Sequence, residues 1–306
     1  MPKNEASYAD ELHVAVAAAR DAGAAIRDFY KRANAATYTK SDGSPVTDAD
    51  LAADRIIREH VRARFPADAI LTEEGADDRA RLRVRRCWVV DPLDGTAQFV
   101  AHTGEFDVLV ALVVAGRPVV GVAYQPIGDL LCAATLGGGA WLEHAGERRS
   151  LQFAPVRPGE APRPATSTWF GGPATLPRLA HISERAAAAP PALVDVGFQA
   201  RSFLGDDASG RAYDVFMGLP LSPEEAMASE WDFAASDVIT TEAGGVFSDL
   251  RGQPHRYNKP TPRNFRGLLI ASDPITHARF LAALRDDMST HGEYAPEETD
   301  ADADRG

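Results

Sequence analysis

The most informative segment of the sequence is Trp88-Val89-Val90-Asp91-Pro92-Leu93-Asp94-Gly95-Thr96. An apolar strand runs into two carboxylates three positions apart, which can point at one spot if the chain turns there. Pro92 fixes its own φ and Gly95 permits a φ that other residues avoid, so this turn is pre-shaped. If Thr96 opens a helix, its backbone N–H groups face the same spot and suit a phosphate. Taken alone, the segment could also be an ordinary Asx turn.

A phosphate beside two carboxylates requires a cation. At about 4 Å and an effective dielectric constant near 20, each contact between like charges costs roughly 4 kcal/mol. A hard divalent cation removes this conflict, and Mg²⁺ commonly binds through a few carboxylates and a substrate phosphate. The segment therefore predicts a Mg²⁺ site.

The composition excludes several other classes of protein. The chain has 306 residues, 45% of them hydrophobic, and a formal net charge of −12. This charge argues against nucleic-acid binding, which normally uses a basic surface. Cys87 and Cys132 match neither a disulfide framework nor a zinc spacing. The longest apolar stretch, near residues 106–115, is about half of a membrane span, and acidic and basic residues interrupt the N-terminal apolar residues, so that no signal peptide is visible. We expect a cytoplasmic protein that binds neither nucleic acid nor membrane.

The chain is predicted to have two halves. Residues 154–164 contain four prolines and a glycine, which forbid regular structure. We expect an N-terminal α+β half over residues 1–153 with most of the metal ligands, and a proline-rich connection over 154–164. A C-terminal α/β half with Asp232 over 165–290 and a disordered acidic tail over 291–306 are expected to follow. Apolar spacing predicts helices near 12–29, 51–61, 231–243 and 274–284, and strands near 88–90, 106–115, 118–124, 130–136, 192–196, 246–249 and 267–271. Layered sheets covered by helices follow from this order.

Four further segments supply acidic or basic side chains that suit the same site. Glu73-Glu74 follows the second helix, and Asp232 lies at the mouth of a later helix. Asp50 begins the second helix, where it could simply be an N-terminal helix acid. Lys40 lies on a hairpin that turns at Asp42-Gly43 and could be an ordinary solvated lysine.

Together these motifs resemble the inositol monophosphatase family of metal-dependent phosphatases. The resemblance rests on Lys40-Ser41-Asp42, Glu73-Glu74, Asp91-Pro92-Leu93-Asp94-Gly95-Thr96, Trp231-Asp232 and Glu242-Ala243-Gly244-Gly245, in this order, and it covers about residues 8 to 287. It implies a layered αβαβα sandwich of the sugar-phosphatase type. It also implies a phosphoric monoester hydrolase that uses two or three Mg²⁺ ions, is inhibited by Li⁺ and acts on a small phosphorylated metabolite.

The resemblance also implies a role for each motif residue. Glu73, Asp91 and the carbonyl of Leu93 would hold one Mg²⁺, and Asp91, Asp94 and Asp232 a second. Gly95 and Thr96 would present N–H groups to the phosphate. The Thr96 hydroxyl, held by Asp50, would orient the attacking water, and the hairpin of Lys40 would fold over the site. Whether the enzyme forms a homodimer is left open.

The substrate is the least determined feature. An acid seven residues before the metal-binding Asp favours inositol 1-phosphate in this family, and here that count gives Glu225. Residues 220–227 look inserted, however, so Glu225 could match by accident. Residues 104–106 and 116–126 resemble the bacterial 3′(2′),5′-bisphosphate nucleotidase branch, and Arg201 is a candidate ligand of the second phosphate. We lean to the bisphosphate; the alternatives are inositol 1-phosphate or a related sugar phosphate, and a catalytically quiet binding protein.

A run of arginines precedes the first strand of the sheet. We expect Arg79, Arg81, Arg83, Arg85 and Arg86 to form a solvated edge with every second side chain outward.

Overall fold

The computed structural model describes residues 8–33, 35–40, 43–77, 79–169, 172–204, 213–222 and 226–291. The chain forms two compact units. Unit 1 contains residues 1–152, 196–200 and 231–243, and unit 2 contains residues 153–195, 201–230 and 244–306. The segment that carries Asp232 thus clusters with the N-terminal part of the chain, although it follows the proline-rich connection in sequence.

Unit 1 is built on a seven-stranded sheet with the order β3-β4-β5-β6-β7-β8-β9. Only β3 and β4 are parallel, and the other neighbours are antiparallel. The predicted hairpin forms a separate pair of strands, β1 and β2. The strands are β1 Thr37–Thr39, β2 Pro45–Thr47, β3 Ala69–Thr72, β4 Arg86–Asp94, β5 Asp107–Val114, β6 Arg117–Gln125, β7 Leu130–Thr135, β8 Gly139–His144 and β9 Glu147–Leu151.

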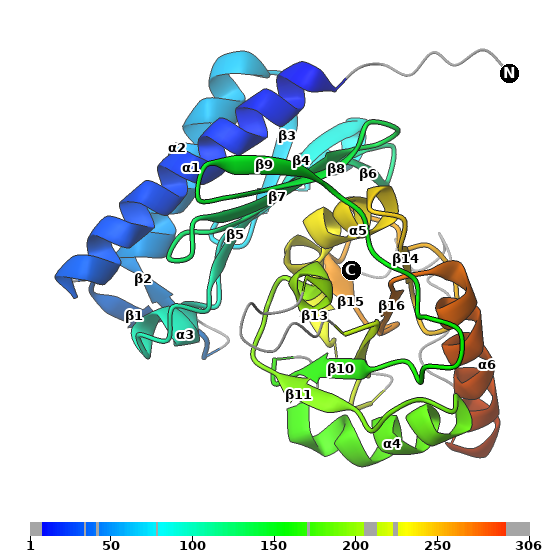
Figure 1. The fold of residues 1–306 in the computed structure, drawn as a ribbon. Helices are drawn as coiled ribbons and strands as arrows, with labels where there is room; N and C mark the ends of the chain where they lie inside the picture. Colours follow the sequence, from blue (N-terminus) through cyan, green and yellow to red (C-terminus); the bar gives the residue numbers. More distant parts are fainter. Residues whose placement is uncertain are drawn as a thin grey trace, which may run out of the picture. The chain divides into compact units, whose positions relative to one another are not determined.

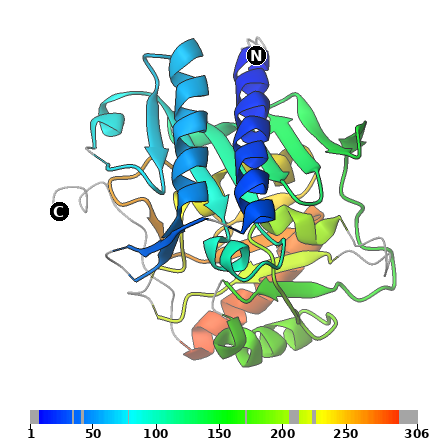
Figure 2. The same cartoon turned by 90° about the vertical axis from the view of Figure 1, so that its left-hand side faces the viewer.

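Helices α1 (Ala9–Arg32) and α2 (Asp48–Arg64) lie side by side on one face of this sheet (Figures 1 and 2). Their buried residues recur every three or four positions, as expected for amphipathic helices, and pack against alternate residues of β5 and β6 such as Val110 and Val122. The predicted N-terminal helices and central strands are thereby confirmed.

Helix α5 (Ala234–Glu242) covers the opposite face. Gly121 of β6 permits its close approach, because a Cβ at this position would lie 2.7 Å from the carbonyl oxygen of Ala235. At the end of α5, the Glu242 carboxylate accepts hydrogen bonds from the backbone N–H groups of Gly137 and Gly139 at 2.8 and 2.9 Å. These contacts fix α5, and with it the preceding Asp232, to the sheet of unit 1.

Unit 2 contains a five-stranded sheet with the order β11-β10-β12-β16-β14. Helices α4 (Gly172–Arg185) and α6 (Pro274–His291) supply apolar side chains such as Ile182 and Phe280 to its core. The strands of this sheet are β10 Pro164–Ser167, β11 Ala192–Val194, β12 Val215–Gly218, β14 Val246–Ser248 and β16 Leu268–Ala271; β13 (Ala228–Ser229) and β15 (Arg263–Asn264) form a separate pair.

The expectation for the arginine run was wrong in part. The segment Ala80–Arg83 is a 3₁₀ helix rather than a strand edge. Arg81 is 3% exposed and donates two hydrogen bonds to the Asp77 carboxylate, at 3.0 and 2.8 Å. A fork-shaped guanidinium can be buried when such a bidentate partner compensates its charge, and this partner could not be identified from the run itself.

Of the helices within the described residues, none has both the length and the hydropathy needed to cross a membrane. The predicted tail over 291–306 lies, except for its first residue, outside the described residues.

Candidate metal and phosphate site

The candidate site forms where β4 ends. The register between β4 and β5 pairs Asp91 with Leu109 and then Asp94 with Asp107, so β4 carries one extra residue there. Pro92 occupies this bulge, where its missing N–H removes no regular ladder bond. The Asp91 carboxylate accepts a hydrogen bond from the Leu93 N–H at 3.0 Å. The bulge breaks the alternation of a strand and allows two carboxylates three residues apart to share one site.

Asp232 completes a compact group of acids with these two residues. Oxygen atoms of Asp91, Asp94 and Asp232 all lie within 4.8 Å of one another. Asp232 ends the 3₁₀ helix Glu230–Asp232 directly before α5. Asp91 is 2% exposed and Asp94 is 7% exposed. Burial raises the pKa of Asp91 well above its usual value, and the charges of Glu73, Asp94 and Asp232 raise it further.

Glu73 approaches Asp91 from the end of the neighbouring strand β3. Because β3 and β4 are parallel and pair Thr72 with Val90, the next residue along β3 lies beside Asp91. The Glu73 N–H continues this ladder by donating to the Val90 carbonyl at 3.2 Å. The parallel pairing therefore brings together two acids that are 18 positions apart in the sequence.

The predicted turn and short helix follow the acids. Gly95 has a φ of 102° and begins helix α3, Thr96–Val100. The Thr96 hydroxyl donates to Asp50 Oδ1 at 2.8 Å. The other oxygen of Asp50 accepts the Thr47 N–H at 2.8 Å, which completes a capping box at the start of α2. Asp50 is thus both a helix-capping acid and the partner of Thr96, and its burial raises its pKa.

Lys40 is not a solvated lysine. Its ammonium donates to Glu73 Oε1 at 2.7 Å and to Glu74 Oε1 at 2.6 Å. Burial opposes the charge on Lys40, but these two hydrogen bonds outweigh it and raise the pKa of the ammonium above its usual value. Burial also raises the pKa of Glu74 to about 7, with the ion pair acting in the opposite direction.

Neither of the two substrate candidates is among the described residues of unit 1. Arg201 belongs to the 3₁₀ helix Gln199–Phe203, is partly exposed and falls in unit 2. Glu225 lies outside the described residues. Their roles stay predictions.

Two acids near the site have no role in the predictions from the sequence. Asp107, which is 1% exposed, faces Asp94 in the register of β4 and β5. The sequence feature that could have indicated Asp107 is its place as an acid at the start of an otherwise apolar strand. Glu74 was noted only as a neighbour of Glu73, and nothing in the sequence indicated its ion pair with Lys40.

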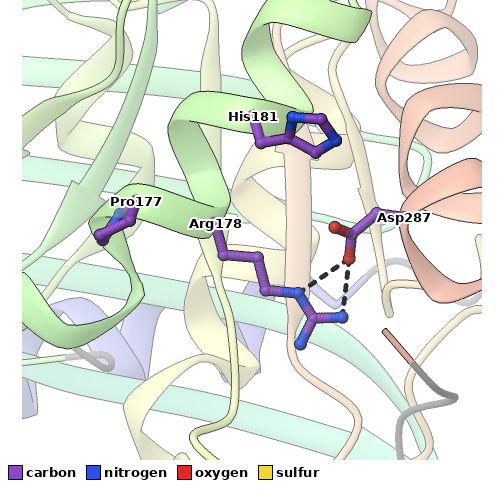
Figure 3. A pocket seen from close by; sticks show the side chains of 4 residues that line it. All are labelled: Pro177, Arg178, His181 and Asp287. Atoms are coloured by element: carbon purple, nitrogen blue, oxygen red, sulfur yellow. Dashed lines mark hydrogen bonds and ion pairs between the residues drawn. The ribbon is translucent and has the colours of Figure 1, made fainter. Parts of the chain in front are cut away.

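Unit 2 also contains a cavity of about 340 Å³, lined by Pro177, Arg178, His181 and Asp287 (Figure 3). Arg178 Nε donates to Asp287 Oδ2 at 2.8 Å, and the carboxylate is 1% exposed. The guanidinium charge is balanced within the cavity, where Asp287 is the one acid among the described lining residues. These lining residues therefore do not form a cluster of acids like that of unit 1.

Known proteins are similar to this chain in sequence and in fold. A model of the inositol monophosphatase family matches residues 8–289. The chain belongs to the inositol monophosphatase family. It has 33% identity over 243 residues to the 3′(2′),5′-bisphosphate nucleotidase CysQ of Aggregatibacter actinomycetemcomitans, covering 79% of this chain and 85% of that protein. It has 32% identity over 291 residues to the Nus factor SuhB of Escherichia coli strain K12, covering 91% of this chain and 97% of that protein.

Solved structures of this family agree. The crystal structure of CysQ from Bacteroides thetaiotaomicron is 27% identical, with a TM-score of 0.69, over 87% of this chain and 98% of that chain. The extragenic suppressor protein SuhB from Bartonella henselae is 25% identical, with a TM-score of 0.70, over 90% and 99%. The layered α/β sandwich is confirmed. This inositol monophosphatase family member is an enzyme that hydrolyses phosphoric monoesters of small molecules.

The residues present fit the metal dependence of the family. A group of buried, ionised carboxylates destabilises the protein unless a cation compensates their charge, and the raised pKa of Asp91 reflects this destabilisation. Oxygen-only donors are the ligands that Mg²⁺ prefers. The acids of unit 1 therefore form a site that could bind a divalent metal ion.

Proposed function

We propose that the chain is a Mg²⁺-dependent phosphomonoesterase whose substrate is a 3′(2′),5′-bisphosphate nucleotide such as 3′-phosphoadenosine 5′-phosphate. The observation that carries the metal-dependent reaction is the cluster of Asp91, Asp94 and Asp232, with oxygen atoms within 4.8 Å of one another. The choice of substrate is supported by relatives that are named bisphosphate nucleotidases and are 31–33% identical to the chain.

The metal ions would be held by the side chains of Glu73, Asp91, Asp94 and Asp232 and the carbonyl of Leu93. Bound Mg²⁺ supplies Lewis-acid chemistry, because it lowers the pKa of water and neutralises charge on a phosphoryl group. Two or three ions are the number that the family resemblance implies.

In this proposal, Thr96 orients the attacking water. Its hydroxyl proton is engaged by Asp50 at 2.8 Å, so the lone pairs of Oγ1 stay available to accept a hydrogen bond from a water molecule. The Gly95 and Thr96 N–H groups would hold the scissile phosphate. Positioning of this kind supplies a large part of catalysis in phosphoryl transfer.

The second phosphate of the proposed substrate requires a cation outside the metal centre. Arg201 is our candidate, because arginine suits bidentate contacts to phosphate. Arg201→Gln should raise KM for the bisphosphate while sparing a generic monoester such as glycerol 2-phosphate. An equal loss on both substrates would contradict this role.

Phosphate release from purified enzyme tests the substrate. We expect higher kcat/KM for 3′-phosphoadenosine 5′-phosphate than for inositol 1-phosphate, and no turnover of either in excess EDTA. Inositol 1-phosphate is the second candidate, since solved inositol monophosphatases such as that of Zymomonas mobilis are similar to the chain, at 25% identity and a TM-score of 0.69. The opposite ranking, together with loss of activity in Glu225→Gln, would assign the enzyme to the inositol branch.

A further inference from the structure

One ammonium group is shared by two adjacent carboxylates beside the metal site. Lys40 Nζ lies 2.7 Å from Glu73 Oε1 and 2.6 Å from Glu74 Oε1. The side chains are 18%, 24% and 6% exposed, respectively, so Glu74 is the more buried of the two acids. The Lys40 N–H donates to the Ser44 carbonyl at 2.8 Å, which anchors the lysine to the hairpin between β1 and β2.

The two acids differ in what else they face. Glu73 lies beside Asp91 in the parallel pair and contributes to its raised pKa. It is therefore the acid of this pair that a divalent ion at Asp91 would engage. An ammonium group and a divalent cation on one carboxylate repel each other, so Lys40 must weaken its contact with Glu73 when metal binds. Glu74 can retain the ammonium, since its contact does not depend on Glu73.

We propose that Lys40 is an internal cation that competes with Mg²⁺ for Glu73, and that Glu74 is the positioning residue that holds Lys40 when the metal takes its place. The inference rests on the metal site of the proposed function. It predicts that the ion pair of Glu74 with Lys40 sets the affinity of the substrate-free enzyme for Mg²⁺.

Isothermal titration calorimetry of metal-free protein with Mg²⁺, without substrate, tests the competition. Lys40→Met removes the competitor and should tighten Mg²⁺ binding by roughly fivefold. Glu74→Gln directs Lys40 to Glu73 alone and should weaken binding by a similar factor. Glu11→Gln is the matched control: it removes one negative charge and an ion pair, that with Arg86 at 3.0 Å, and should leave the affinity unchanged.

The double variant Lys40→Met/Glu74→Gln separates this mechanism from a general effect of charge. If Glu74 acts through Lys40, the double variant binds Mg²⁺ as tightly as Lys40→Met does, within about twofold. If both residues act only through the local field, their effects add and the double variant returns to the affinity of the wild type. That additive result would overturn the proposal.

A second variant and the wild type itself provide two further measurements. If Glu74→Gln does not fold, as judged by circular dichroism, Glu74→Asp keeps the charge but withdraws it by one methylene, and should weaken Mg²⁺ binding in the same direction. An unchanged affinity in Glu74→Asp would then overturn the proposal. Absence of Mg²⁺ binding to the wild type would instead contradict the proposed metal-dependent function, and so the two failures are distinguishable.

Discussion

At the scale of single residues, the site is governed by carboxylates that are buried close together. Asp91 is flanked by Glu73, Asp94 and Asp232, and burial with these charges raises its pKa. Such a group destabilises the metal-free protein when it is ionised, and it supplies the negative charge that a divalent cation needs. Affinity for metal and stability without metal are therefore opposed at this residue.

Replacement of Asp91 measures both effects. Asp91→Asn should lower activity at least about a hundredfold, because it removes a charge that both proposed metal positions share. The metal-free variant should be at least as stable as the wild type, since repulsion among the acids is relieved. Steady-state kinetics at saturating Mg²⁺ and thermal unfolding in EDTA give the two readouts. Near-normal Mg²⁺-dependent turnover would refute the assignment of the site.

The pKa of Glu74 predicts the pH dependence of stability. Its value is raised from 4.5 to about 7 in the folded protein, so the folded state binds more protons than the unfolded state between these pH values. Stability from this group is therefore lost as the pH rises from about 4.5 to about 7. In EDTA, the melting temperature of the wild type should fall by roughly 3 °C more than that of Glu74→Gln over this pH range. Parallel curves for the two proteins would show that Glu74 does not titrate in this way.

At the scale of elements, two irregularities shape the site: the bulge at the end of β4 and the left-handed Gly95 before α3. The bulge sets Asp91 and Asp94 toward one place, and Gly95 lets the chain turn so that Thr96 meets Asp50. A regular strand would alternate its side chains between the two faces of the sheet. The chemistry therefore depends on a local departure from the sheet.

Substitution of this glycine tests the turn. Gly95→Ala places a Cβ at a φ of 102° and should cost about 1–3 kcal/mol of stability. It should also lower kcat about tenfold or more, because misplacement of Thr96 disturbs the geometry of attack. Gly146→Ala is the matched control, since Gly146 has a φ of 81° and a Cβ there meets no atom within 4 Å. Equal kinetic losses in both variants would show that strain alone, and not the turn at the site, controls activity.

At the scale of the whole molecule, the acids come from segments that are distant in the sequence. Glu73 follows β3, Asp91 and Asp94 end β4, and Asp232 precedes α5, yet all belong to unit 1. Folding of this unit assembles the complete set of carboxylates. Unit 2 holds Arg201, the candidate for the second phosphate.

Inhibition by Li⁺ is a prediction for the assembled enzyme. The family resemblance implies that Li⁺ occupies the metal position of the leaving group after hydrolysis, and Asp91, Asp94 and Asp232 are present for it. Turnover at saturating Mg²⁺ should fall with increasing LiCl but not with equal NaCl. Activity that is insensitive to Li⁺ would leave the phosphatase assignment intact and contradict membership of a Li⁺-sensitive branch.

The family and the order of the main helices and strands could be predicted from the sequence. The sequence also indicated Asp91, Asp94 and Asp232 as candidate ligands, and the fold brings their oxygen atoms within 4.8 Å of one another. Those features depend on local signals: the spacing of apolar residues in α1 and α2, and the turn chemistry of Pro92 and Gly95. The pairing of Asp50 with Thr96 was reached only through the family resemblance, which the structure supports with a hydrogen bond of 2.8 Å.

The pairs of charged residues could be identified only in the folded protein. The ion pairs of Lys40 with Glu73 and Glu74, the burial of Arg81 against Asp77 and the place of Asp107 opposite Asp94 depend on strand register and on loops packed against one another. The sequence alone does not distinguish a charged side chain that is solvated from one that is buried. Its environment is fixed by residues far along the chain, because desolvation and the nearest opposite charge are properties of the folded state.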